Sequence, residues 1–182
     1  MEHPLEKILK ACDDHSGKFP NREIHLVLED GHQTEGVIHW NPPANEEEIT
    51  NLFQSKGWFL PDDLRQLYLT HNGGVLFQHP YYGGGTEILS LDKILKIHEE
   101  IINIPDEWYP IAWTDVVIGS ICIDSKRCEQ NNYPYLFFLD AMDSPEEAIS
   151  IHTDFTTWLD RLIVCQGSEY WTWEKYNKFK FK

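Results

Sequence analysis

The sequence has no long apolar run and no export signal. Its mean hydropathy is −0.45, and no apolar stretch approaches the ~20 residues that a membrane-spanning helix requires. The first residues, MEHPLEKILKACDD, lack the basic and then apolar order of a secretion signal. We therefore expect a cytoplasmic protein that does not associate with membranes.

Cysteines are few, and none form a CxxC pair. The chain has four, and they are widely spread: Cys12, Cys122, Cys128 and Cys165. Without an export signal we expect reduced thiols, since cytosolic proteins seldom keep disulfides. A disulfide or a zinc site would need distant cysteines to meet in the fold.

Motifs that carry catalysis or hold cofactors are also missing. No HExxH, GxxxxGK[ST] or GxSxG pattern occurs. His25, His32 and His39 recur every seven residues, but they fall in a predicted hairpin, where a step of seven changes face. The 30 carboxylates are too many to single out a catalytic pair. We expect no enzyme, no catalytic residue, no cofactor and no metal site.

Basic residues are scarce. The chain has 15 Lys and Arg against 30 Asp and Glu, a net charge of −15. Four lysines lie in the last eight positions, which leaves 11 basic residues against 30 acidic ones over residues 1–174. Such a surface repels nucleic acid and attracts basic proteins. The same charge also suits plain solubility, and composition leaves both interpretations open.

Residues 1–41 look like an N-terminal extension of the main domain, 42–182. Apolar residues at helical spacing predict a short helix over residues 4–12. Alternation over residues 23–40, with an Asp-Gly turn signal, predicts a β-hairpin. Asn41-Pro42-Pro43 then breaks the pattern.

The stretch Lys56–Gly74, KGWFLPDDLRQLYLTHNGG, contains one complete helix. The helix before it is expected to start at an Asn45 cap paired with Glu48. Pro61 suits the first turn of the next helix, and Gly73 suits the left-handed position after it. We expect its apolar residues to be core: Trp58, Leu60, Leu64, Leu67 and Tyr68.

From residue 111 onward, β-rich runs follow each other with short links. Parallel strands need long crossovers, so these strands should pair antiparallel. Helices are predicted over residues 91–102 and from residue 155 onward. The fold class is therefore α+β, a mainly antiparallel sheet flanked by helices.

The order of these segments resembles the SUKH superfamily. The resemblance covers roughly residues 41–165. It is carried by the acidic capped helix from Pro43, the Leu60-Pro61 to Asn72-Gly73-Gly74 block, the Ile111-Ala112-Trp113 strand, and Phe155 with Trp158-Leu159. The superfamily contains fungal cell-wall-synthesis regulators and bacterial immunity proteins that neutralise polymorphic toxins, and its members are not generally enzymes.

The resemblance implies a bacterial immunity protein whose partner is a cognate protein toxin. We expect that toxin to be basic, with a nuclease domain as the favoured kind. Candidate partner-binding residues are exposed loop aromatics and acidic clusters: Tyr81, Tyr82, Glu99, Glu100, Asp106, Glu107, Asp140 and Asp143. The two tyrosines precede Gly83-Gly84-Gly85, and there we favour a tight hairpin whose tyrosines cover the core edge over a binding lip.

Two other functions remain open. One is a non-enzymatic regulatory interaction module of the cell-wall-regulator type, although such regulators usually carry long disordered arms and we expect none here. The other is a hydrolase or small-molecule binder that uses the loop at residues 81–85 and nearby carboxylates.

Overall fold

The computed structural model describes residues 3–28 and 31–173, and its centre is one antiparallel sheet. The strands follow each other across the sheet in sequence order. They are β1 Ile24–Val27, β2 Gln33–Trp40, β3 Gly74–Gln78, β4 Thr86–Ile88, β5 Trp108–Thr114, β6 Gly119–Asp124, β7 Leu136–Asp140 and β8 Ile149–Ile151. The predicted α+β class with a mainly antiparallel sheet is confirmed.

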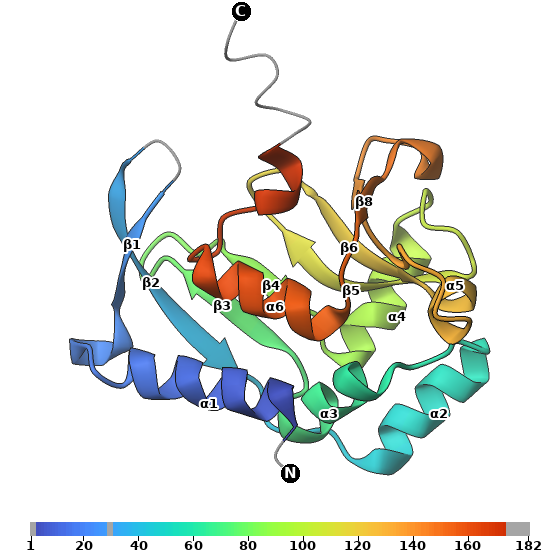
Figure 1. Cartoon of the computed structure of the whole chain (residues 1–182), viewed down its shortest axis with the longest axis horizontal. Coiled ribbons are helices and arrows are strands. Elements are labelled where there is room, and N and C mark those ends of the chain that lie inside the picture. Colours follow the sequence, from blue (N-terminus) through green and yellow to red (C-terminus); the bar gives the residue numbers. More distant parts are fainter. Residues whose placement is uncertain (1–2, 29–30, 174–182) are drawn as a thin grey trace, which may run out of the picture.

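Helices cover both faces of this sheet (Figure 1). They are α1 Pro4–Ser16, α2 Glu46–Lys56, α3 Asp62–Thr70, α4 Leu91–Glu100, the short α5 Ser125–Glu129 and α6 Phe155–Val164. Helices α1, α3 and α6 contact one another on one side, while α4 packs against β5. Figure 1 shows α6 in front of the sheet and α4 behind it.

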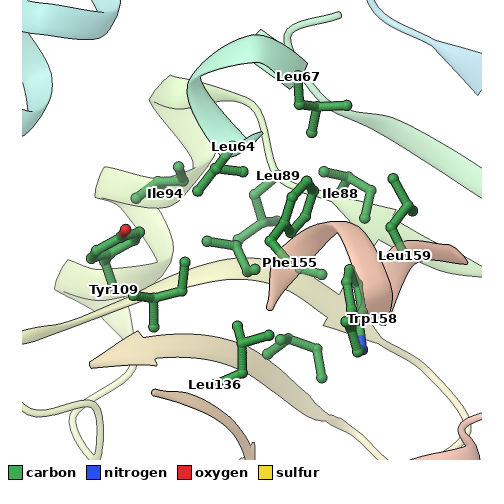
Figure 2. Packing of buried hydrophobic residues seen from close by; sticks show 14 of the residues in the cluster. Leu64, Leu67, Ile88, Leu89, Ile94, Tyr109, Leu136, Phe155, Trp158 and Leu159 are labelled. Carbon is green, nitrogen blue, oxygen red and sulfur yellow. The ribbon is translucent and has the colours of Figure 1, made fainter. Parts of the chain in front are cut away.

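The core follows from the alternation of side chains along the strands. In β7, Leu136 and Phe138 join the main cluster, whereas Phe137 and Leu139 join a second cluster. Successive strand residues point to opposite faces, so the two clusters lie on opposite sides of the sheet. Figure 2 shows Phe155 and Trp158 of α6 among the side chains of the main cluster, with the Phe155 ring next to Leu89 and Ile88.

The predicted helix boundaries hold closely. Asn45 and Glu48 form a capping box at the start of α2. Gly57 ends α2 in the left-handed conformation, with φ 66°. Pro61, predicted within the first turn of α3, is instead the residue just before it. Its extended backbone suits that place, because Pro fixes φ and lacks an N–H.

The predicted core residues of this block are buried, with one exception. Leu60 is only partly buried and packs against the outside of the cluster. The other four are within the core: Trp58, Leu64, Leu67 and Tyr68.

The predicted hairpin of residues 23–40 forms as β1 and β2. Strand β2 also pairs with β3, where Trp40 lies opposite Gly74. Helix α1 contacts α6, and its Leu5 is fully buried. The division of the chain at residue 41 stays a prediction.

The sheet has two unlike ends. Because every neighbouring pair of strands is antiparallel, the chain changes ends with each strand. Every second connection between strands therefore lies at the same end of the sheet. We call one the hairpin end; of the described residues it consists of 28, 31–32, 79–85, 115–118 and 141–148. The other, the crossover end, carries the longer connections 41–73, 89–107 and 125–135. The hairpin connections lie in the upper half of Figure 1, away from the N-terminus.

Candidate partner-binding surface

Tyr81 and Tyr82 sit at the tip of the connection between β3 and β4. His79 and Gly83 exchange backbone hydrogen bonds across the loop, both of 3.1 Å. The Nδ1 atom of His79 accepts the N–H groups of Tyr81 and Tyr82 at 3.1 and 3.2 Å. The ring of Tyr82 lies 4.6 Å from the His79 ring. The tip is thus held by its own hydrogen bonds.

Both tyrosines point into solvent. Tyr81 is 81% exposed and Tyr82 is 89% exposed. The favoured expectation that they cover the core edge is therefore wrong. The glycines explain the difference, since Gly83, Gly84 and Gly85 all adopt positive φ and turn the chain outward before β4 begins.

Other exposed apolar side chains gather at the same end of the sheet. Val116 is 86% exposed and Met142 is 91% exposed. Over the residues that the structure describes, the large exposed hydrophobic side chains of the hairpin end and its strand borders are Val27, Leu28, Tyr81, Tyr82, Val116, Ile118 and Met142. Patches of this kind mark interaction sites more often than isolated apolar residues do.

Neighbouring loops of the hairpin end are in contact. The N–H of Ala141 donates to the carbonyl of Ile118 at 2.9 Å, which joins the β5–β6 and β7–β8 connections. A Cβ atom at Gly84 would lie 3.9 Å from Asp115 Oδ2, so the β3–β4 and β5–β6 connections also adjoin. These loops therefore form one surface.

A buried carboxylate supports the middle of that surface. Glu169 is only 4% exposed, and it accepts the N–H groups of Val116 and Val117 at 3.1 to 3.3 Å. This contact fixes the β5–β6 connection from beneath. Sequence reasoning did not single out Glu169, because nothing in its neighbourhood distinguishes it from the other 29 acidic residues.

The loops of the hairpin end carry negative charge only. Their described residues include four acidic residues and no Lys or Arg. The acidic residues are Asp115, Asp143, Glu146 and Glu147, with Asp140 at the end of β7. A surface of exposed aromatic and aliphatic groups with carboxylates and no cations favours a positively charged partner.

The eight predicted partner-binding residues divide into two groups. Tyr81, Tyr82, Asp140 and Asp143 lie at or beside the hairpin end. Asp140 Oδ1 accepts the N–H of Met142 at 2.9 Å and so shapes the turn that presents this methionine. The Nδ2 atom of Asn103 donates to the carbonyls of Asp140 and Asp143 at 3.1 and 2.7 Å.

The other four lie near α2 and the start of β5. Glu99 pairs with Lys56 of α2 at 3.4 Å, and Glu100 pairs with Lys96 at 4.0 Å. Asp106 and Glu107 immediately precede β5, at the crossover end. Their carbonyls accept Trp58 Nε1 and the N–H of Ser125.

The histidines do not assemble a metal site in the described residues. His25 and His32, expected on opposite faces, line one hollow of about 320 Å³ together with His79. Still, over residues 3–28 and 31–173 no three His, Cys, Asp or Glu side chains form a ligand set.

All four cysteines are in the reduced thiol form, as predicted. Burial raises the pKa of Cys12 to about 11 and that of Cys128 to about 12. It also raises the pKa of the fully buried Cys122. These three thiols therefore stay protonated near neutral pH.

A larger groove lies between α1, α6 and the first strands. Its volume is about 420 Å³ and its lining is mainly apolar, including Ile8, Ala11, Ile24 and Ile163. Its polar and charged lining residues include Lys7, His15, Asp160 and Gln166.

Within the described residues, no helix combines the length and apolar character that crossing a bilayer requires.

The molecule is an antiparallel α+β domain with an exposed aromatic and acidic surface at one end of its sheet. The chain belongs to the SMI1 / KNR4 family (SUKH-1), whose model matches residues 43–161. The predicted SUKH resemblance is confirmed.

Two proteins of Bacillus subtilis (strain 168) are similar to this chain. The uncharacterized protein YnaB is 31% identical over 137 residues, which cover 75% of this chain and 88% of YnaB. The uncharacterized protein YobM is 28% identical over 185 aligned positions, which cover 96% of this chain and 92% of YobM.

Proposed function

We propose that this protein is an immunity protein that binds and neutralises a cognate bacterial toxin. It acts by occupying the toxin and not by catalysis. The observation that carries the proposal is the net charge of −15 on a SUKH-1 scaffold whose hairpin-end loops carry carboxylates and no Lys or Arg. Membership of the family supports a function in protein binding, and the negative charge supports a partner that is positively charged.

The charge favours a toxin domain with a basic substrate cleft, and a nuclease domain is the kind we propose. A nuclease must hold phosphates, so its cleft is lined by Lys and Arg. Carboxylates on a rigid protein surface can take the place of those phosphates. Complementary charge also speeds the encounter, and an immunity protein must reach its toxin before the toxin reaches its substrate.

Co-expression tests the proposal. The chain is produced in a bacterial host together with the C-terminal domain of the secreted protein encoded by the neighbouring gene. We expect growth to be restored to the level seen without the toxin. YnaB serves as a family-matched, non-cognate control, which we expect not to protect. Growth no better than with an empty vector would reject the immunity function and leave the regulatory alternative.

A further inference from the structure

We infer that the hairpin end is the surface that enters the toxin's basic cleft, with Tyr81 and Tyr82 as its anchors and the surrounding carboxylates as its rim. This inference rests on the proposed immunity function. Beyond that function, it specifies which end of the sheet binds the toxin and which side chains make the contact. It excludes from the binding surface Asp106 and Glu107, at the opposite end of the sheet.

The two tyrosines are suited to anchoring because the backbone that carries them is held by hydrogen bonds. Their backbone N–H groups are held by His79 Nδ1, and the loop is closed by the His79–Gly83 pair. Binding groups that are fixed beforehand lose little entropy in the complex. Tyrosine also offers a large contact area with only two side-chain torsions, which is why it is frequent in binding loops.

The charge pattern matches the layout of a protein interface. The centres of interfaces are depleted in charge and rich in aromatic residues and Met, while their rims are polar. At the hairpin end, Tyr81, Tyr82, Val116 and Met142 are exposed, and the charged residues between and beside them are all acidic. From the β3–β4 to the β7–β8 connection there are four strand spacings, or ~19 Å. That width fits within a standard interface of about 800 Å² per partner.

Two other occupants are less well supported. A second copy of this chain would bring two acidic surfaces together, and like charges oppose that contact. The chain's own C-terminus has Lys175, Lys178, Lys180 and Lys182 in residues 174–182. Four lysines offset only part of the −19 of residues 1–174, so negative charge remains for a basic partner.

Binding by paired variants tests the inference. The probe is the purified toxin domain encoded by the neighbouring gene, rendered inactive. The hairpin-end variants are Tyr81→Ser/Tyr82→Ser and Asp115→Lys. The matched crossover-end controls are Phe59→Ser, which changes an aromatic side chain that is 39% exposed, and Glu107→Lys. All five substitutions in these four variants change exposed side chains, and circular dichroism verifies that each variant is folded.

We expect the double tyrosine variant to bind about 100-fold more weakly, because two anchors are lost. We expect Asp115→Lys to slow association about tenfold. The two controls should stay within about threefold of the wild type, a range typical of exposed positions outside the contact.

The outcomes separate the inference from the function. If the wild type binds but only Phe59→Ser or Glu107→Lys weakens binding, the hairpin-end assignment is overturned and the immunity function stands. If the wild type neither binds nor protects, the function fails and the assignment fails with it. A variant with all four C-terminal lysines changed to Gln tests whether the chain's own C-terminus binds the hairpin end. If the double tyrosine substitution no longer weakens toxin binding in that variant, the tyrosines bind the C-terminus and not the toxin, and the assignment is overturned.

Discussion

Glu169 and Val117 are 52 residues apart in sequence, yet both carboxylate oxygens of Glu169 accept the N–H of Val117, at 3.3 and 3.1 Å. The same carboxylate accepts the N–H of Val116 at 3.1 Å. A side chain after the last long helix therefore holds the connection between β5 and β6. That connection forms the middle of the hairpin end, so its order depends on a residue outside the sheet.

Replacing Glu169 by Ala is expected to lower the free energy of unfolding. The loss should be about 1–3 kcal/mol, because the part-buried N–H groups of Val116 and Val117 would lose the carboxylate that accepts them. Urea denaturation measures the change, and amide hydrogen exchange should show faster exchange at Val116 and Val117. Glu169→Gln keeps one acceptor oxygen and should lose less. Equal stability of the Ala variant and the wild type would contradict a supporting role for this carboxylate.

Gly73→Ala is expected to destabilise the protein more than Gly57→Ala does. Both glycines have positive φ, 76° and 66°, so both replacements strain the backbone. A Cβ atom at Gly73 would lie 2.4 Å from the carbonyl oxygen of Ile88, whereas nothing lies within 4 Å at Gly57. We expect a cost of about 1 kcal/mol at Gly57 and a larger one at Gly73. Thermal unfolding of the two variants compares them, and a similar loss at both sites would show that β4 shifts freely to admit the new atom.

Asp63 should make stability depend on pH. Its Oδ2 atom accepts the N–H and hydroxyl of Thr156 at 3.0 and 3.1 Å. Burial raises the pKa of Asp63 above its ordinary value of 3.8, although the hydrogen bonds from Thr156 counteract part of this effect. The folded state therefore holds this proton more tightly than the unfolded state. Its contribution to stability is complete at low pH and is lost as pH rises through the window above 3.8.

Asp63→Asn removes this titration. We expect the free energy of unfolding of the wild type, minus that of the variant, to fall as pH rises from about 3.5 to 7. Urea denaturation over that range measures the difference. Asp62→Asn, at an exposed position in the same first turn of α3, controls for the loss of one carboxylate. Wild-type and Asp63→Asn curves that run parallel would contradict the prediction.

Association with the toxin domain should slow as salt is added. Opposite charges steer the encounter, and the screening length falls from about 10 Å at 0.1 M to about 3 Å at 1 M ionic strength. We expect the association rate constant to fall about tenfold across that range, with a much smaller change in the dissociation rate constant. Stopped-flow fluorescence measures the association rate directly. A rate indifferent to salt would remove charge steering from the mechanism.

Local signals in the sequence were sufficient for much of the framework. The Asn45–Glu48 capping box and the left-handed Gly57 involve residues close in the chain, so their chemistry is readable from spacing. Period-two alternation located the β1–β2 hairpin for the same reason. Short links between β-rich runs also sufficed to predict an antiparallel sheet.

The candidate surface was less predictable because it depends on distant residues. The sequence marks Tyr81 and Tyr82 as aromatic but not as exposed, since exposure is decided by what packs above them. Val116 and Met142 were not proposed, although apolar residues inside turn-rich connections were a usable signal. The support from Glu169 and the Asn103 bonds to Asp140 and Asp143 arises only once the sheet is assembled.

The in-order antiparallel sheet has a consequence for change over time. Its helix-bearing crossovers and its short hairpins are kept at opposite ends, so the tips of the short hairpins can vary in length and composition while the packed interior stays as it is. Substitutions in a few loop tips could therefore change which partner such a protein binds during evolution. The same property makes the molecule a practical starting scaffold for libraries in which the hairpin tips are randomised and new binders are selected.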